Sequence, residues 1–189
     1  MRILPVRVAG PDGQAVTTEL AKTHLRVDGP DEDILIASLI AAATEHLDGY
    51  HGILGRCIAP QSWRQDYAGF EADMVLNVSP VLKIESVQYV DPSGVIRDLE
   101  GARLFAAAGR TIVRPPAGQT WPDVAQQEDA VQITVRAGYA VVPTPIKQAI
   151  LLLVGHWYAN REAVVTGATL ATLPLAVDRL LAPYRRPPV

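Results

Sequence analysis

Apolar residues toward the C-terminal end of the chain recur with the period of an α-helix. On one face they are spaced by four, three and four positions: Ile146, Ile150, Leu153 and Trp157. Leu151, Leu152 and Val154 fill much of the rest of the helix surface, which predicts a helix buried on nearly all sides. The apolar run is far shorter than the roughly 20 residues of a membrane span. We therefore expect a central core helix, with Ile150, Leu153 and Trp157 among its core residues.

Three other segments also have helical periodicity. A helix of about 20 residues is expected from Asp31 onward. Its apolar face consists of Ile36, Ile40, Ala43, Leu47 and Tyr50. A brief helix is expected over 17–24, because Thr17 or Thr18 can cap it. A last helix is expected from Pro174 to Pro183, where Val177, Leu180, Leu181 and Tyr184 share one face.

The hydrophobic period changes to two between Ile58 and Val135, which is typical of strands. The clearest strand is 131–137, where apolar and polar residues alternate throughout. The alternation changes phase at Glu85-Ser86, which predicts a β-bulge. Two hairpins are expected, one around the turn at 91–94 and one joining 103–105 to 111–114.

One proline-rich segment between the predicted strands cannot form regular structure. It runs from Pro115 and Pro116 to Trp121 and Pro122, and we expect it to be an exposed loop.

The order of these elements is helices, then short strands, then helices. This order predicts a mainly α member of the α+β class: a bundle of about four helices with a small inserted antiparallel sheet. We expect a single domain over 1–189, with the bundle over about 17–55 and 144–184 and the insertion over about 58–137. The segment 173–189 is expected to be a docking tail.

Composition and charge exclude several classes of protein. The net charge of −3 gives no overall attraction to nucleic acid or to an anionic membrane. The single cysteine, Cys57, excludes an internal disulfide. The first 30 residues lack the basic-then-apolar pattern of a signal peptide, so none is expected.

Candidate catalytic and metal-binding residues are few. The four histidines are His24, His46, His51 and His156. Their spacing fits no metal motif, so no metal and no cofactor are expected. Cys57 is expected to be a small core residue.

His156 and Glu162 are the one candidate for a catalytic pair. They are six residues apart, so a helix would turn them out of alignment. We favour the interpretation that His156 and its neighbours are partnered polar groups at a helix end.

The C-terminal residues Arg185-Arg186 are too few charges to form a nucleic-acid site. They are followed by two prolines and lie at a terminus that is expected to be exposed. Such a tail is free to lie on a partner.

Several short motifs follow one another along the chain: Leu25-Arg26-Val27-Asp28, Gly55-Arg56, Gln61-Ser62-Trp63, Pro80 with Ile84-Glu85-Ser86-Val87, Ala137-Gly138-Tyr139, the stretch His156 to Glu162, and Leu180-Leu181-Ala182-Pro183-Tyr184-Arg185. Taken in this order, the set resembles the head–tail connector (adaptor) proteins of long-tailed bacteriophages and gene transfer agents. No single motif is specific, but their order covers most of the chain. The pair Ile53-Leu54 departs from the polar turn that the family pattern favours there.

The resemblance implies a structural protein of the neck, not an enzyme, assembled in the bacterial cytoplasm. It would form a ring of about twelve copies below the portal protein and extend the DNA channel toward the tail. Its partners would be the portal protein, neighbouring copies, a stopper or tail terminator, and DNA that passes without sequence-specific binding. The C-terminal segment would bind the portal through Leu173, Val177, Leu180, Leu181, Tyr184, Arg185 and Arg186.

The loop with Pro115, Pro116, Trp121 and Pro122 would contact the next ring or a neighbouring subunit. Two alternatives remain open at this point. One is a stopper or tail-completion protein, and the other is a small hydrolase using His156 and Glu162.

Overall fold

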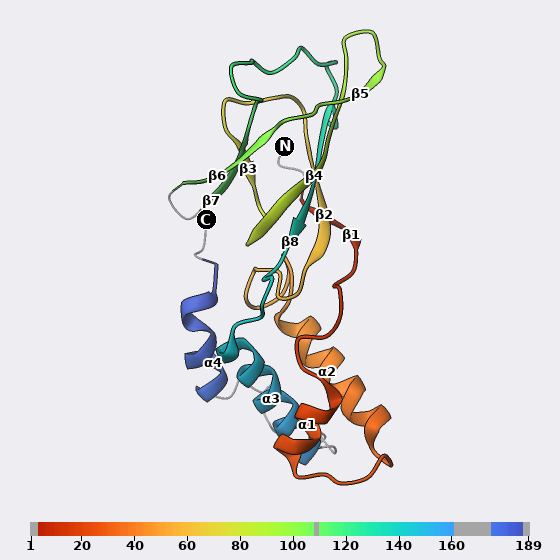
Figure 1. Cartoon of the computed structure of the whole chain (residues 1–189), viewed down its shortest axis with the longest axis vertical. Coiled ribbons are helices and arrows are strands. Elements are labelled where there is room, and N and C mark those ends of the chain that lie inside the picture. The colour runs from red at the N-terminus through yellow and green to blue at the C-terminus, as the bar shows by residue number, and fades with distance from the viewer. Residues whose placement is uncertain (1–3, 108–109, 161–174, 187–189) are drawn as a thin grey trace, which may run out of the picture. The chain divides into compact units, whose positions relative to one another are not determined.

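A computed structural model describes residues 4–107, 110–160 and 175–186 of the chain (Figure 1). The chain divides into two compact units, each made from two separate stretches of sequence. The sheet unit comprises Met1–Asp12 and Ala59–Ala140, and the helical unit comprises Gly13–Ile58 and Val141–Val189. The prediction of a single domain over 1–189 stays a prediction.

The larger sheet of the sheet unit is antiparallel and has five strands in the order β1-β2-β8-β4-β5 (Figure 1). The strands are β1 (Val6–Ala9), β2 (Gln61–Tyr67), β4 (Val81–Val90), β5 (Ile96–Asp98) and β8 (Val131–Ala137). The predicted strand at 131–137 is confirmed as β8, whose alternate residues are buried. The predicted bulge is also confirmed, since the pairing of β4 with β8 shifts register between Ile84 and Ser86.

The smaller sheet has three antiparallel strands, β3 (Met74–Leu76), β7 (Arg110–Arg114) and β6 (Arg103–Ala107), in the order β3-β7-β6. Both predicted hairpins are confirmed, because β6 pairs with β7 and β4 pairs with β5. In the β4–β5 turn, the N–H of Gly94 donates to the carbonyl of Asp91 at 2.8 Å. Gly94 has a φ of +85°, a conformation that glycine adopts without steric cost.

The core of the sheet unit is formed by side chains on one face of each sheet. The fully buried or nearly buried ones include Trp63, Met74, Val113, Val131, Ile133 and Val135. Gln65 is a buried polar side chain that links the two sheets. Its amide nitrogen donates to the Val75 carbonyl at 3.2 Å, and its oxygen accepts the N–H of Asn77 at 2.8 Å. A buried amide needs such partners, so this position fixes how β3 lies against β2.

The helical unit is built around α3 (Thr144–Ala159), which packs against three other helices. These are α1 (Thr18–Leu25), α2 (Asp33–Leu47) and α4 (Leu175–Leu181), and α4 continues into the 3₁₀ helix η1 (Ala182–Tyr184). The predicted central helix is confirmed: Ile146 and Ile150 are fully buried, and Leu153 is nearly so. Trp157 is half-buried, and its ring lies 6.1 Å from that of His46.

The two N-terminal helices differ slightly from their predicted bounds. Thr17 caps α1, because its hydroxyl accepts the N–H of Leu20 at 3.3 Å. The helix predicted from Asp31 is shorter than expected and ends at Leu47, so Tyr50 lies in the following turn. Asp48 begins this turn, and its carboxylate accepts the N–H of Ile58 at 2.5 Å.

No helix in the described ranges is long and apolar enough to cross a membrane.

The fold class requires a correction. The prediction of a mainly α helical bundle with a small inserted sheet is wrong, because the described residues contain eight strands in two antiparallel sheets beside four α-helices. The strands occupy about as many of these residues as the helices do, and they form a compact unit of their own. The reason is physical: seven of the eight described strands have only three to seven residues and give a weak local signal, and strand pairing depends on residues far apart in sequence.

Candidate interaction surfaces

The described part of the C-terminal segment packs on its own helical unit. Val177 and Leu181 are four residues apart on one face of α4, and both are fully buried. The surface that buries them includes α3, against which α4 packs. The interpretation of this tail as free of its own domain therefore needs correction, because one apolar face of α4 completes the core.

The two arginines that follow η1 hold the segment in place. The guanidinium of Arg185 donates to Asp178 at 2.7 Å, an ion pair seven residues back in the chain. The backbone N–H of Arg186 donates to the Leu54 carbonyl at 2.9 Å. Its guanidinium lies 5.7 Å from the centre of the Tyr50 ring, within the range of a cation–π interaction. Arg185 and Arg186 therefore have structural partners within the chain.

The seven residues predicted to bind the portal fall into three groups. Val177 and Leu181 are buried, while Leu180, Tyr184, Arg185 and Arg186 are partly exposed. Leu173 lies outside the described residues. The structure adds three exposed side chains on α4 that the sequence interpretation omitted, Leu175, Ala176 and Arg179. Leu175 is the large apolar one among them, with 66% of its surface exposed.

The predicted loop 115–122 is exposed only in its central part. Residues 117–120 are exposed, whereas Pro116 is buried. The Trp121 ring stacks on Phe70, with the ring centres 4.3 Å apart and an angle of 6° between the planes. Its indole N–H donates to the Glu71 carbonyl at 2.8 Å. Trp121 thus anchors the loop to the sheet unit.

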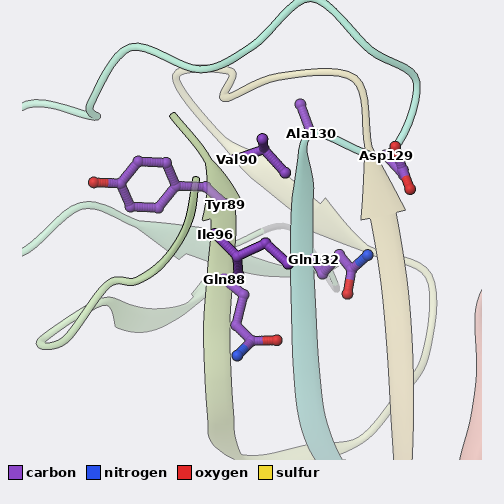
Figure 2. Close-up of a pocket in the computed structure, with 7 residues that line it drawn as sticks. All are labelled: Gln88, Tyr89, Val90, Ile96, Asp129, Ala130 and Gln132. Atoms are coloured by element: carbon purple, nitrogen blue, oxygen red, sulfur yellow. The ribbon is translucent and has the colours of Figure 1, made fainter. Parts of the chain in front are cut away.

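A small pocket opens on the outer face of the five-stranded sheet, next to β5 (Figure 2). Its volume is about 40 Å³, and it is lined by Gln88, Tyr89, Val90, Ile96, Asp129, Ala130 and Gln132. Figure 2 shows the Ile96 side chain extending toward β8 while the Tyr89 ring points away. Pockets for small molecules measure roughly 300–1,000 Å³, so this one is too small for a substrate or nucleotide.

The turn beside this pocket contains a strongly stabilised carboxylate. The hydroxyl of Ser93, the N–H of Val95 and the guanidinium of Arg97 all donate to Asp91, at 2.5, 3.0 and 2.7 Å. These hydrogen bonds, the Ser93 hydroxyl first, hold the pKa of Asp91 well below its usual value. The hydrogen bond to Asp91, together with the negative charge of that carboxylate, raises the pKa of the Arg97 guanidinium.

Among the described residues, the side chains considered for metal binding are not brought together. His156 is exposed at the end of α3, where the side chain of its neighbour Asn160 donates to the His156 carbonyl at 2.7 Å. Glu162 lies outside the described residues. Within the described part of the chain, no group of three or more metal-ligating side chains forms a site. Cys57 is fully buried.

The sequence matches the profile of one protein family over residues 14–187, described as head completion protein. The chain belongs to the head completion protein family. No curated protein shows significant sequence similarity to it.

Three solved structures resemble this chain along its whole length, and each alignment covers 99% of this chain and 97% of the other. A chain in the neck of an empty gene transfer agent particle, computed with C6 symmetry, has a TM-score of 0.76 at 23% identity. A chain in the virion of the native particle has a TM-score of 0.75 at 21% identity. A chain in the native neck, computed with C12 symmetry, has a TM-score of 0.68 at 20% identity. At these identities the likeness establishes the fold.

The predicted resemblance to connector proteins of phages and gene transfer agents is thereby confirmed. Membership of a head completion family also confirms the structural role expected from that resemblance.

Proposed function

We propose that this member of the head completion protein family is a head–tail connector (adaptor) subunit in the neck of a phage-like particle. The observation that carries the proposal is the family match over residues 14–187, which takes in both the sheet unit and the helical unit. The fold likeness to chains in the necks and virion of gene transfer agent particles supports the location. The role is structural, without turnover or cofactor.

We propose that the subunit forms a ring of about twelve copies that extends the DNA channel. The C6 and C12 symmetries of the similar necks support a closed ring. The portal protein would bind on the head side and a stopper or tail terminator on the tail side. DNA would pass without sequence-specific binding, in keeping with the net charge of −3.

The portal contact is assigned to the outward side of the C-terminal segment. Leu175 and Arg179 are exposed there, and Leu180 and Tyr184 are partly exposed. Val177 and Leu181 face the core and support this surface from beneath. An apolar group surrounded by polar and basic groups is the usual composition of an interface centre. The loop at 117–120 is the corresponding candidate for contact with the next ring or a neighbouring subunit.

The first test measures the mass of the purified chain by light scattering, alone and mixed with the portal protein of the same particle. A large complex that appears only with the portal is expected.

Leu175→Asp should weaken portal binding at least about tenfold, or about 1.4 kcal/mol, because it places a charge at the centre of the contact. Ile34→Asp is the matched control, since Ile34 is 89% exposed on α2 and should leave binding unchanged.

The outcomes separate this function from a tail-side role. A chain that binds the tail-side proteins and ignores the portal is a stopper or tail-completion protein. Equal portal binding by the wild type and Leu175→Asp would remove the C-terminal assignment and leave the ring itself in place.

A further inference from the structure

The outer face of the three-stranded sheet carries three arginines. Arg103 of β6 lies opposite Arg114 of β7, and Arg110 is four residues before Arg114 on the same strand. Directly paired residues share a face of a sheet, and so do residues two or four apart in a strand. Val113, on the other face, is fully buried in the core. The three arginines are therefore on the outward side, where all of them are exposed; we call this surface the arginine face.

An aromatic ring on the arginine face holds two of its cations in place. Phe105 is two residues after Arg103 in β6. Its ring centre lies 5.3 Å from the guanidinium carbon of Arg103 and 5.1 Å from that of Arg114, both within the range of a cation–π interaction. The Nε of Arg103 also donates to the carbonyl of Pro115 at 3.0 Å. Side chains that are already held lose less freedom when a partner binds.

The arginine face is positively charged, although the whole chain has a net charge of −3. Asp73 neutralises Arg114, with 2.7 Å between the nitrogen and the oxygen. Within the described part of the chain, no carboxylate pairs with Arg103 or Arg110. These two guanidinium groups are available to carboxylates of a partner, which arginine can bind through two parallel hydrogen bonds.

A protein partner suits the arginine face better than nucleic acid does. Two unpaired charges per copy give little affinity for DNA against salt. The Phe105 ring already contacts two guanidinium groups, so it is not free to stack on a base. Arginine and aromatic residues are enriched in protein–protein interfaces.

A segment of the opposite charge lies between β7 and β8 in the same unit. Residues 123–129, which we call the acidic segment, contain three exposed carboxylates and no basic residue: Asp123, Glu128 and Asp129. The amide of Gln127 donates to Asp129 at 2.8 Å and leaves its negative charge in place. Among the described residues, no cation pairs with any of the three carboxylates.

The acidic segment and the arginine face lie on different sides of the sheet unit. The N–H of Ala125 donates to the Val90 carbonyl, and the N–H of Val90 donates to the Ala130 carbonyl, both at 2.8 Å. Asp129 lines the same small pocket as Ile96 of β5 (Figure 2). Figure 1 shows β6 and β7 on the side of the unit opposite β5. The chain therefore has two separate surfaces of opposite charge.

Arg97 is the basic residue of β5, next to the acidic segment, and it does not cancel the charge of that segment. Its guanidinium is bound by Asp91 at 2.7 Å. The ion pair is neutral as a whole, so the three carboxylates of the acidic segment determine the charge of this region.

We propose that the arginine face of one copy binds the acidic segment of the next copy. This inference rests on the proposed ring. A ring closes when each subunit carries two different complementary surfaces, and these two surfaces form such a pair. Rotation about the ring axis keeps equivalent parts at one level, so the sheet unit of one copy meets the sheet unit of the next. The partner is a second copy of this chain.

The other acidic region of the chain, at the start of α2, is a poorer partner. Lys22 binds Asp33 at 2.6 Å, and the hydroxyl of Tyr158 donates to Glu32. These carboxylates already hold helices of the helical unit together, and they belong to a different unit from the arginine face.

The test reverses one charge on each surface and measures the yield of the complete ring–portal complex by native mass spectrometry. Arg110→Glu and Glu128→Lys should each lower this yield at least about tenfold, because like charges then face each other. Both side chains are exposed, so the melting temperature of each variant should stay near that of the wild type.

Mixing the two variants in equal amounts should restore the yield to within about threefold of the wild type. In a ring that alternates the variants, the two reversed surfaces meet at one contact and the two native surfaces meet at the next. Every contact then joins opposite charges. A contact within one chain could not be restored in this way, because each chain would keep its own like charges.

Glu45→Lys is the matched control, since Glu45 is exposed on α2 in the helical unit. It makes the same change of charge as Glu128→Lys and should leave the yield unchanged. Mixed with Arg110→Glu, it should form no more complex than it forms alone.

The outcomes keep this inference apart from the proposed function. Wild-type yields from both single variants, or a mixture that does not recover, would overturn the pairing of the two surfaces while the adaptor role stands. Particles in which Arg110→Glu keeps a complete ring but loses DNA would assign the arginine face to DNA and overturn the pairing as well. A wild-type chain that forms no complex with the portal would overturn the proposed function and this interface with it.

Discussion

At the scale of single residues, Trp121 shows how an irregular segment can be fixed by one side chain. Its ring stacks on Phe70 and its N–H donates to the Glu71 carbonyl, both within the sheet unit. Aromatic stacking of this kind contributes about 0.5–1.5 kcal/mol beyond the area that it buries. The exposed residues 117–120 are thus held at a fixed place on the sheet unit.

Substitution of Trp121 tests this anchoring. Trp121→Ala should lower the free energy of unfolding by about 2 kcal/mol, less than the 3–5 kcal/mol of a fully buried tryptophan. Trp121→Phe keeps an aromatic ring and loses the hydrogen bond, so it should cost about 1 kcal/mol. Denaturant unfolding followed by circular dichroism measures both values, and equal losses would mean that stacking contributes nothing.

Asp91 gives a second prediction, because its pKa is lowered by the Ser93 hydroxyl, the Val95 N–H and Arg97. The unfolded-state pKa is about 3.9, above the folded value. The stabilisation is therefore fully present above about pH 4 and is lost as the pH falls through the lowered folded pKa. Asp91→Asn removes this dependence. The difference in melting temperature between wild type and Asp91→Asn should be largest near neutral pH and should shrink in acid, and a constant difference would contradict the assignment.

At the scale of elements, α4 has one buried face and one exposed face. Its inner face completes the helical core through Val177 and Leu181, and its outer face carries Leu175 and Arg179. The ion pair of Asp178 with Arg185 and the hydrogen bond from Arg186 to Leu54 hold the following residues. The portal contact that we propose uses the outer face and leaves the inner one in place.

The two faces of α4 should respond differently to truncation. Leu181→Ala should lower the free energy of unfolding by about 2–4 kcal/mol, because Leu181 is fully buried. Leu175→Ala should change it by less than about 0.5 kcal/mol, since that side chain is mostly exposed. Thermal or denaturant unfolding distinguishes the two variants. A large loss of unfolding free energy in Leu175→Ala would contradict the exposed position of Leu175.

The sequence predicts some of these elements well and others poorly, for identifiable reasons. The apolar faces of α2 and α3 follow from local spacing, and so do the alternation of β8 and the phase change near Ser86. The sheets were underestimated because β2 pairs with β8 about 70 residues away, which no local pattern reveals. The four-residue spacing of Val177 and Leu181 was visible as one helical face, but it did not indicate that the face would pack on the chain itself.

The candidate surfaces could be predicted only in part. Arg185 and Arg186 were identified, yet their partners Tyr50, Leu54 and Asp178 emerge only from the fold.

At the scale of the whole molecule, the family match and the proposed ring agree on a structural subunit. The proposed ring needs one surface for a partner ring and two for neighbouring copies. The outward side of α4 is the surface that we propose for the portal.

The strand order β1-β2-β8-β4-β5 has a consequence for how the protein is made. The middle strand is β8, the last strand to leave the ribosome, so β2 and β4 are synthesised long before the strand that joins them. Until Val131–Ala137 emerges, the nascent chain holds apolar side chains that have no complete sheet to cover them. Such a chain is prone to aggregate, so we expect its yield during expression to depend on the speed of translation and on chaperones. A ribosome-bound chain that stops before β8 should be digested rapidly by protease, and one that extends past it should become resistant.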